Sequence, residues 1–223
     1  AQHHQLEKRA AYAGSHLEDG SCYIVLSSVH WREAWKYGER AYRYCQLDVG
    51  HAIAALRYSA ALLGWELTIE QQLGDKEIAA LCGIDRMDEF NGVEHESPDL
   101  LLRVDATPSL QSETIKSLIA DAQWLGLPSL LDSHPFYEWK IIDQVSQACH
   151  KPSLNPKTTK KETSSNHPGV ETDAANLIKQ RRSARAFQPD KVMDKESFLG
   201  ILKSLLPEQR HLPFDLLTET QQL

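Results

Sequence analysis

The amino-acid sequence predicts a helix-dominated fold with a few strands. Apolar residues recur at helical spacing in several segments, of which Leu47 to Leu63 is the longest. Short β-rich runs are fewer, and Ser21 to Ser27 is one of them. With 41% hydrophobic and 25% charged residues, the composition is that of an ordinary soluble globular protein. These three observations favour helices packed with a small number of strands.

The first hundred residues contain two expected strands and one long helix. The runs Ser21 to Ser27 and Leu100 to Val104 predict the strands. Between them we expect a helix from Leu47 to Leu63, with Asp48 as its N-cap and Gly64 just past its end. This helix is rich in alanines that would let another helix approach closely, namely Ala52, Ala54, Ala55, Ala60 and Ala61.

Three shorter helices are expected between Gly64 and residue 150. Asp75 is a candidate cap for a helix through Leu81 that Cys82-Gly83 closes. A second begins at Ser112 and stops at Gly126 and Pro128. Its apolar positions are Ile115, Leu118, Ile119 and Ala122. A third covers about Phe136 to Cys149.

A change of composition divides the chain. Residues 151–169 hold three prolines, four lysines and almost no residue able to enter a core, which indicates a linker. We therefore expect domains at residues 1–150 and 171–223, with residues 151–170 between them. Beyond the linker, Asp173 and Asp194 are candidate N-caps of two further helices. Those helices alone bury too little surface to fold confidently, so the second unit looks incomplete.

Charge and composition exclude several classes of function. The formal net charge of -7 provides no global positive field for nucleic acid or an anionic membrane. No apolar run approaches the roughly 20 residues that span a bilayer, and Ala1 to Arg9 is polar rather than signal-like. The four cysteines are far apart and form no C-x-x-C pair, so we expect reduced thiols, no metal site and a cytoplasmic protein.

An arginine cluster follows the first helix of the second unit. Gln180 to Phe187 reads QRRSARAF, in which three arginines surround Ser183. Guanidinium groups and a hydroxyl are suited to bind a phosphate monoester. Taken alone, a solvated helix C-terminus, where the helix dipole favours arginine, is the simpler interpretation.

An aromatic and basic cluster occupies Trp31 to Tyr44, with the sequence WREAWKYGERAYRY. This density of Trp, Tyr, Arg and Lys is expected where a protein stacks on a planar ligand and donates charge to it. The adjacent Lys36 and Tyr37 are candidate proton-transfer groups. The structural alternative is that Trp31 and Trp35, at i and i+4, bury one helix face while the charged residues form solvated ion pairs.

Together, these clusters resemble the nitroreductase superfamily of flavoenzymes, and specifically its SagB-type dehydrogenase branch. Trp35 to Arg86 is similar to the second half of a nitroreductase module, with its K-Y-x-x-R-x-Y-R run, its D-x-G-H-A helix and its L-G-W turn. Ile178 to Val192 is similar to the start of such a module, with its R-R-S-x-R-x-F motif. The family places the R-R-S arm first, so the reversed order here implies a tandem protein. Residues 1–150 would be the C-terminal part of one module and residues 171–223 the truncated N-terminal part of the next.

The resemblance implies an α+β, nitroreductase-like fold with a central antiparallel sheet among helices. It also implies FMN bound between two modules or in a homodimer, hydride transfer at flavin N5, and a small-molecule or peptide-derived substrate. The reaction would be a dehydrogenation, or a reduction driven by NAD(P)H.

Roles carry over to residues that match the family motifs. Lys36 and Tyr37 match a pair that removes a proton in azoline-oxidising members. The residues implied in FMN binding are Arg181, Arg182, Ser183, Arg185, Gly64 and Trp65. An alternative function is a catalytically degenerate scaffold that uses the same fold to bind a peptide or partner protein.

Overall fold

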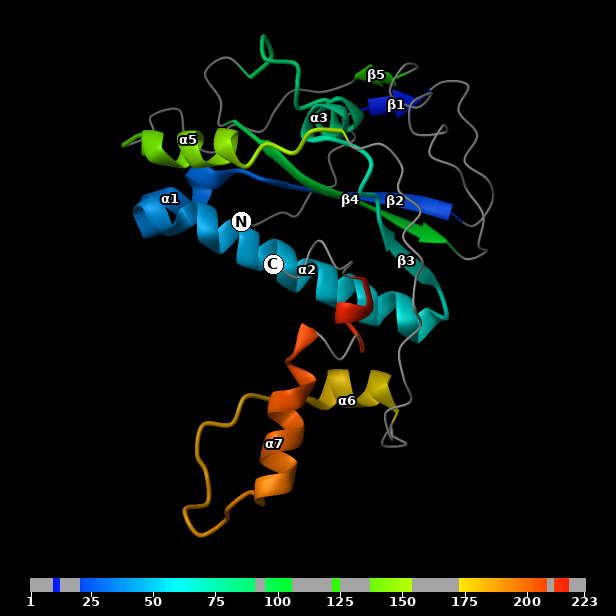
Figure 1. Ribbon diagram of the computed structural model, residues 1–223, viewed down its shortest axis with the longest axis vertical. Helices are drawn as coiled ribbons and strands as arrows, with labels where there is room; N and C mark the ends of the chain where they lie inside the picture. The colour runs from blue at the N-terminus through cyan, green and yellow to red at the C-terminus, as the bar shows by residue number, and fades with distance from the viewer. Residues whose placement is uncertain are drawn as a thin grey trace. The chain divides into compact units, whose positions relative to one another are not determined.

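The structure, a computed structural model, is an α+β fold of helices and antiparallel strands (Figure 1). It describes residues 10–12, 21–90, 95–105, 122–124, 137–153, 173–207 and 211–216. The chain divides into two compact units. The first consists of Ala1–Ala52 and Trp65–Lys157, and the second consists of Ile53–Gly64 and Thr158–Leu223.

A three-stranded antiparallel sheet, in the order β2-β4-β3, forms the centre of the first unit. Strand β2 spans Ser21–Ser28, β4 spans Ser97–Asp105 and β3 spans Glu66–Ile69. The expected strands at 21–27 and 100–104 are thus confirmed, and the additional strand β3 pairs with the second half of β4. A separate antiparallel pair joins β1 (Ala10–Tyr12) to β5 (Ala122–Trp124).

Helices account for most of the remaining described residues. In the first unit α1 spans His30–Tyr37, a 3-10 turn spans Gly38–Arg40, α3 spans Asp75–Cys82 and α5 spans Lys140–Ala148. Helix α2, Ala41–Leu63, begins in the first unit and ends in the second. The second unit adds α6 at Ala174–Gln180, α7 at Lys195–Ser204 and a 3-10 turn at Phe214–Leu216.

The long helix differs from its prediction at one end only. Helix α2 begins at Ala41, so Asp48 lies inside the helix and its predicted role as N-cap is wrong. The 3-10 turn leads directly into α2 and supplies its start instead of a side-chain cap. Gly64 ends the helix as predicted, because its φ of 71° lies in the left-handed region that favours glycine.

The start of α3 also needs correction. Its N-cap is Gly74, and Asp75 is the first residue of the helix. The Asp75 carboxylate is instead used by the chain after α5, since the backbone N–H of Lys151 donates to Asp75 Oδ2 at 2.9 Å. At the other end Gly83 closes the helix with a φ of 68°, as predicted.

Two other helix predictions are altered. Ala122 was expected on the helix that begins at Ser112, but Ala122–Trp124 forms strand β5 by pairing with β1. The rest of that prediction lies outside the described residues. The helix expected from Phe136 to Cys149 is shorter, because Trp139 is the N-cap of α5 and Cys149 is its C-cap.

The beginning of the predicted linker is packed against α3. The backbone N–H of Asp75 donates to Lys151 O at 3.0 Å, and Ser153 Oγ donates to Glu77 Oε2 at 2.6 Å. A Cβ on Gly74 would lie 2.6 Å from the Ser153 backbone nitrogen, so the close approach requires glycine there. Residues 151–153 are therefore anchored, and residues 154–170 lie outside the described part.

The hydrophobic core lies where α3 covers β4. Leu101 of β4 is fully buried and packs with Leu73, Ile78 and Leu81. The neighbouring Leu102 is also fully buried, although successive strand residues point to opposite faces of a sheet. Figure 1 shows α3 on one side of the sheet and the first half of α2 on the other. Both faces of the three-stranded sheet are therefore covered by helices.

The second unit confirms the local predictions beyond the linker. Asp173 accepts a hydrogen bond from the N–H of Asn176, and Asp194 accepts one from the N–H of Ser197, so both are N-caps as predicted. In the part of α2 that belongs to this unit, Arg57 makes a two-nitrogen ion pair with Asp215. Within the described ranges, no helix is both long and apolar enough to cross a bilayer.

Candidate functional site

The two predicted catalytic residues lie at the end of α1. Lys36 is exposed, and its Nζ lies 5.0 Å from the centre of the Tyr37 ring. The pKa of Lys36 is raised above its ordinary value, mainly by the hydrogen bond to Tyr37. Lys36 therefore keeps its proton at neutral pH, which makes it a cationic hydrogen-bond donor.

An aromatic cavity adjoins Lys36. It has a volume of about 500 Å³ and is lined by Trp31, Ala34, Trp35, Lys36, Gly38, Tyr137 and Trp139. The α1 residues come from the cluster identified in the sequence, whereas Tyr137 and Trp139 come from the segment before α5. The rings of Tyr137 and Trp139 meet edge to face, with 4.9 Å between their centres. The predicted residue Lys36 thus lies in the wall of a cavity built mainly from aromatic side chains.

One glycine allows the two sides of this cavity to meet. Gly38 ends α1 with a φ of 57°, and a Cβ there would lie only 3.2 Å from the Trp139 indole. Trp139 also packs against the buried cluster of Ala34, Ala41 and Ile142. The indole is therefore held between a glycine turn and the core, which makes that wall of the cavity rigid.

The alternative prediction, that Trp31 and Trp35 bury one face of a helix, is confirmed only in part. Trp35 is 72% exposed, although Trp31 on the preceding turn is partly buried. An exposed indole beside a cavity is available to stack on a planar ligand. The arrangement is suited to hold a flat ring system next to one positive charge.

The predicted phosphate arm belongs to the second unit. Arg181, Arg182, Ser183 and Arg185 are all exposed after the end of α6. Arg182 donates to the backbone carbonyls of Lys179 and Arg181, at 2.8 Å each, so it caps the helix C-terminus. That contact is the structural role that the helix dipole predicts. The guanidinium groups of Arg181 and Arg185 remain accessible to an anion.

The other two residues that were predicted to bind the cofactor are Gly64 and Trp65. Gly64 makes the left-handed turn after α2, and Trp65 is 43% exposed immediately before β3. Neither lines the aromatic cavity. Their assignment to cofactor binding stays a prediction.

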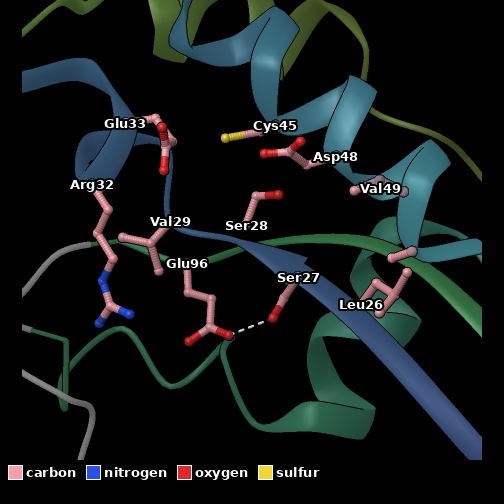
Figure 2. A pocket seen from close by; sticks show the side chains of 11 residues that line it. Leu26, Ser27, Ser28, Val29, Arg32, Glu33, Cys45, Asp48, Val49 and Glu96 are labelled. Carbon is pink, nitrogen blue, oxygen red and sulfur yellow. Dashed lines mark hydrogen bonds between the residues drawn. The ribbon is translucent and has the colours of Figure 1, made fainter. Parts of the chain in front are cut away.

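A second, more polar pocket was not anticipated from the sequence. It has a volume of about 380 Å³ and lies between the end of β2, α1 and α2. Figure 2 shows Cys45 and Asp48 on α2, with Glu33 of α1 near the thiol. On the opposite side Glu96 accepts a hydrogen bond from Ser27 Oγ. Three carboxylates from different elements thus line one pocket.

Burial and hydrogen bonding explain how the ionisable groups near this pocket behave. Burial raises the pKa of the Cys45 thiol, and the nearby carboxylates add to the effect, so the thiolate is disfavoured at neutral pH. Asp99 accepts hydrogen bonds from Ser28 Oγ at 2.6 Å and from Gln46 Nε2 at 3.2 Å. Burial nevertheless raises the Asp99 pKa. The Cys45 thiol in this pocket is therefore not an activated nucleophile.

His30 lies at the start of α1 and is 8% exposed. Burial is the largest cause that lowers the pKa of this imidazole, and it outweighs the opposing attraction of Asp99 and Asp143. His30 Nε2 has no hydrogen-bond partner among the residues that the structure describes. A neutral, buried histidine of this kind supports the packing of α1, and its ring lies 5.2 Å from that of Tyr42.

Sequence reasoning found one side of the aromatic cavity and missed the other. The sequence places Tyr137 and Trp139 only within the helix expected at about Phe136 to Cys149. Their contact with α1 spans about a hundred residues of chain, so no local pattern pairs them. The polar pocket was missed for the same reason.

Among the described residues, no group of His, Cys, Asp and Glu side chains is arranged to hold a metal ion.

Comparisons with known proteins leave the family unassigned. No family model matches the chain, and neither a curated protein nor a solved structure matches it.

Proposed function

We propose that this chain works in an FMN-dependent oxidoreductase of the nitroreductase or SagB type. One observation carries the proposal: Lys36, which the motif resemblance marks as catalytic, lies in the wall of an aromatic cavity. Three indoles and a phenol around about 500 Å³ provide stacking surfaces for a planar ring. The cavity would receive the substrate beside the flavin.

Lys36 would act at the reacting centre, and Tyr37, which lies outside the described lining of the cavity, would act through its contact with Lys36. FMN, when bound, supplies the acceptor or donor of hydride. Because Lys36 has a raised pKa and keeps its proton, it is a weak acid that is better suited to stabilise negative charge on an acceptor that is being reduced than to release a proton. This favours the reductive direction, with NAD(P)H as the source of electrons, over dehydrogenation.

The arm after α6 fits the phosphate of FMN in part. Arg181 and Arg185 are exposed, and Ser183 adds a hydroxyl donor. Arg182 is engaged by backbone carbonyls, so it would contribute less than the motif implies. We therefore propose that Arg181, Ser183 and Arg185 hold the phosphate.

The test is FMN binding by the whole chain, followed by turnover. Purified protein is titrated with FMN, and quenching of flavin fluorescence is measured. NADPH-driven reduction of menadione is then compared between the wild type and Lys36→Met, for which we expect a loss of at least about tenfold in kcat. Lys203→Met on α7 is the matched control and should leave the rate unchanged. If the chain binds no FMN, its two incomplete modules do not assemble an FMN site, and the proposal that this chain works with FMN is wrong.

The scaffold alternative is favoured by a different observation. Helices α6 and α7 have no buried residues, and their large apolar side chains are exposed. A protein that uses these helices to bind a peptide or partner, without catalysis, would show no turnover. In that case Lys36→Ala and Tyr37→Phe would leave FMN binding and partner binding unchanged.

A further inference from the structure

The aromatic cavity combines a flat, apolar lining with one charge. Trp31 and Trp35 lie one helical turn apart on α1, so they share a face of that helix. Trp139 reaches the same cavity from the segment before α5 and is held there by its contact with Gly38. Indole faces prefer offset or edge contacts with other rings, which an aliphatic ligand cannot provide.

Among the lining residues that the structure describes, Lys36 alone is charged. Among the described residues, no carboxylate lies within ion-pair distance of Lys36, and its main partner is the neighbouring phenol of Tyr37. Glu33, one turn earlier, adds a weaker attraction to Lys36 and lines the polar pocket. The ammonium group is thus available to a ligand that brings its own negative charge.

We infer that the substrate taken by the aromatic cavity is a planar aromatic carboxylate. The inference rests on the proposed function, because it names the substrate class of the same site. The ring would stack among the indoles of Trp31, Trp35 and Trp139, and the carboxylate would accept a hydrogen bond from Lys36 Nζ. One cation pairs with one carboxylate, so a second carboxylate on the ligand would remain in water.

The experiment measures binding of probes to the full chain by quenching of tryptophan fluorescence and by calorimetry. The probes are 2-naphthoate, its neutral analogue 2-naphthamide, and cyclohexanecarboxylate, which keeps the charge but lacks the aromatic ring. Since Lys36 is exposed, we expect 2-naphthoate to bind about threefold or more tightly than 2-naphthamide. Cyclohexanecarboxylate should bind more weakly than either naphthyl probe.

Two variants separate the charge from the rings. Lys36→Gln should abolish the preference for 2-naphthoate over 2-naphthamide. Trp35→Leu should weaken both naphthyl probes by a similar factor, and because this side chain is 72% exposed the variant should fold. Lys203→Gln is the control that keeps the wild-type preference. Equal affinities for the two naphthyl probes, an unchanged preference in Lys36→Gln, or no binding would each overturn the inference.

A parallel titration with FMN distinguishes this inference from the proposed function. If FMN binds but 2-naphthoate does not, the substrate class is wrong and the cofactor stands. If 2-naphthoate binds with the expected preference but FMN does not, the inference about the cavity stands and the proposal that this chain works with FMN is wrong. If FMN displaces 2-naphthoate, the cavity holds the flavin ring and the assignment of the cavity to substrate is overturned.

Discussion

The core around α3 and the helices after residue 172 obey the same local rules but differ in tertiary packing. In α3, Ile78 and Leu81 are buried against Leu101 of β4. In α7, the apolar side chains have the same helical spacing, yet Ile201 is 50% exposed and Leu202 is 44% exposed. Capping and periodicity therefore form a helix in both regions, whereas only the first region gains the free energy of burying its apolar face.

Truncating one leucine in each region should give the largest contrast. Leu101→Ala removes a fully buried side chain, and we expect the free energy of unfolding to fall by about 2–5 kcal/mol. Leu202→Ala removes an exposed side chain and should change it by no more than about 0.5 kcal/mol. Urea unfolding followed by circular dichroism measures both values. Equal losses would show that the face of α7 is covered in solution.

A glycine substitution in each region should have opposite effects. At Gly74 the added Cβ would lie 2.6 Å from the backbone nitrogen of Ser153, so Gly74→Ala should cost about 1–3 kcal/mol by displacing the anchored residues 151–153. At Gly200 in α7, no atom of the described residues lies within 4 Å of an added Cβ, apart from the chain neighbours and the backbone of the helix itself. Gly200→Ala should therefore stabilise its helix by up to about 1 kcal/mol. Thermal melts of the two variants give the signs, and a stable Gly74→Ala protein would contradict the tight approach.

The smallest expected effect concerns His30, a buried residue of the first unit. Its folded-state pKa lies below the ordinary value of 6.5, so the unfolded chain binds the proton more readily. The stability that neutral His30 contributes is present above pH 6.5 and is lost as the pH falls below it. We expect the wild type to lose more stability than His30→Phe between neutral and mildly acidic pH.

Asp99 has the opposite effect on stability. Its pKa is raised in the folded protein, so Asp99 adds to the stability of the folded state as the pH falls. It is present in both proteins, so the difference between their pH profiles reports His30 together with the attraction between His30 and Asp99 that the substitution removes. Unfolding free energies from urea titrations at several pH values provide the measurement. Parallel profiles would show that His30 is not held neutral in the folded protein.

Several features of the fold were predictable because neighbouring residues determine them. Asp173 and Asp194 cap their helices through backbone N–H groups three residues away, and Gly83 ends α3 by a local left-handed turn. The early start of α2 was not predictable from Asp48, because the 3-10 turn before Ala41 carries the helix into that segment. Likewise, the pairing of β5 with β1 overrides the helical spacing of Ala122.

The candidate site divides in the same way. The sequence by itself determined that Lys36 and two tryptophans belong to one cluster, in which Trp31 and Trp35 have the i, i+4 spacing that a helix brings onto one face. Only the tertiary structure decided that Trp139 completes a cavity there, since that contact depends on a glycine without a Cβ and on a core that joins α1 to α5. Local hydrogen bonds and periodicity act over a few residues, whereas a cavity forms between segments about a hundred residues apart, and chain folding alone brings them together.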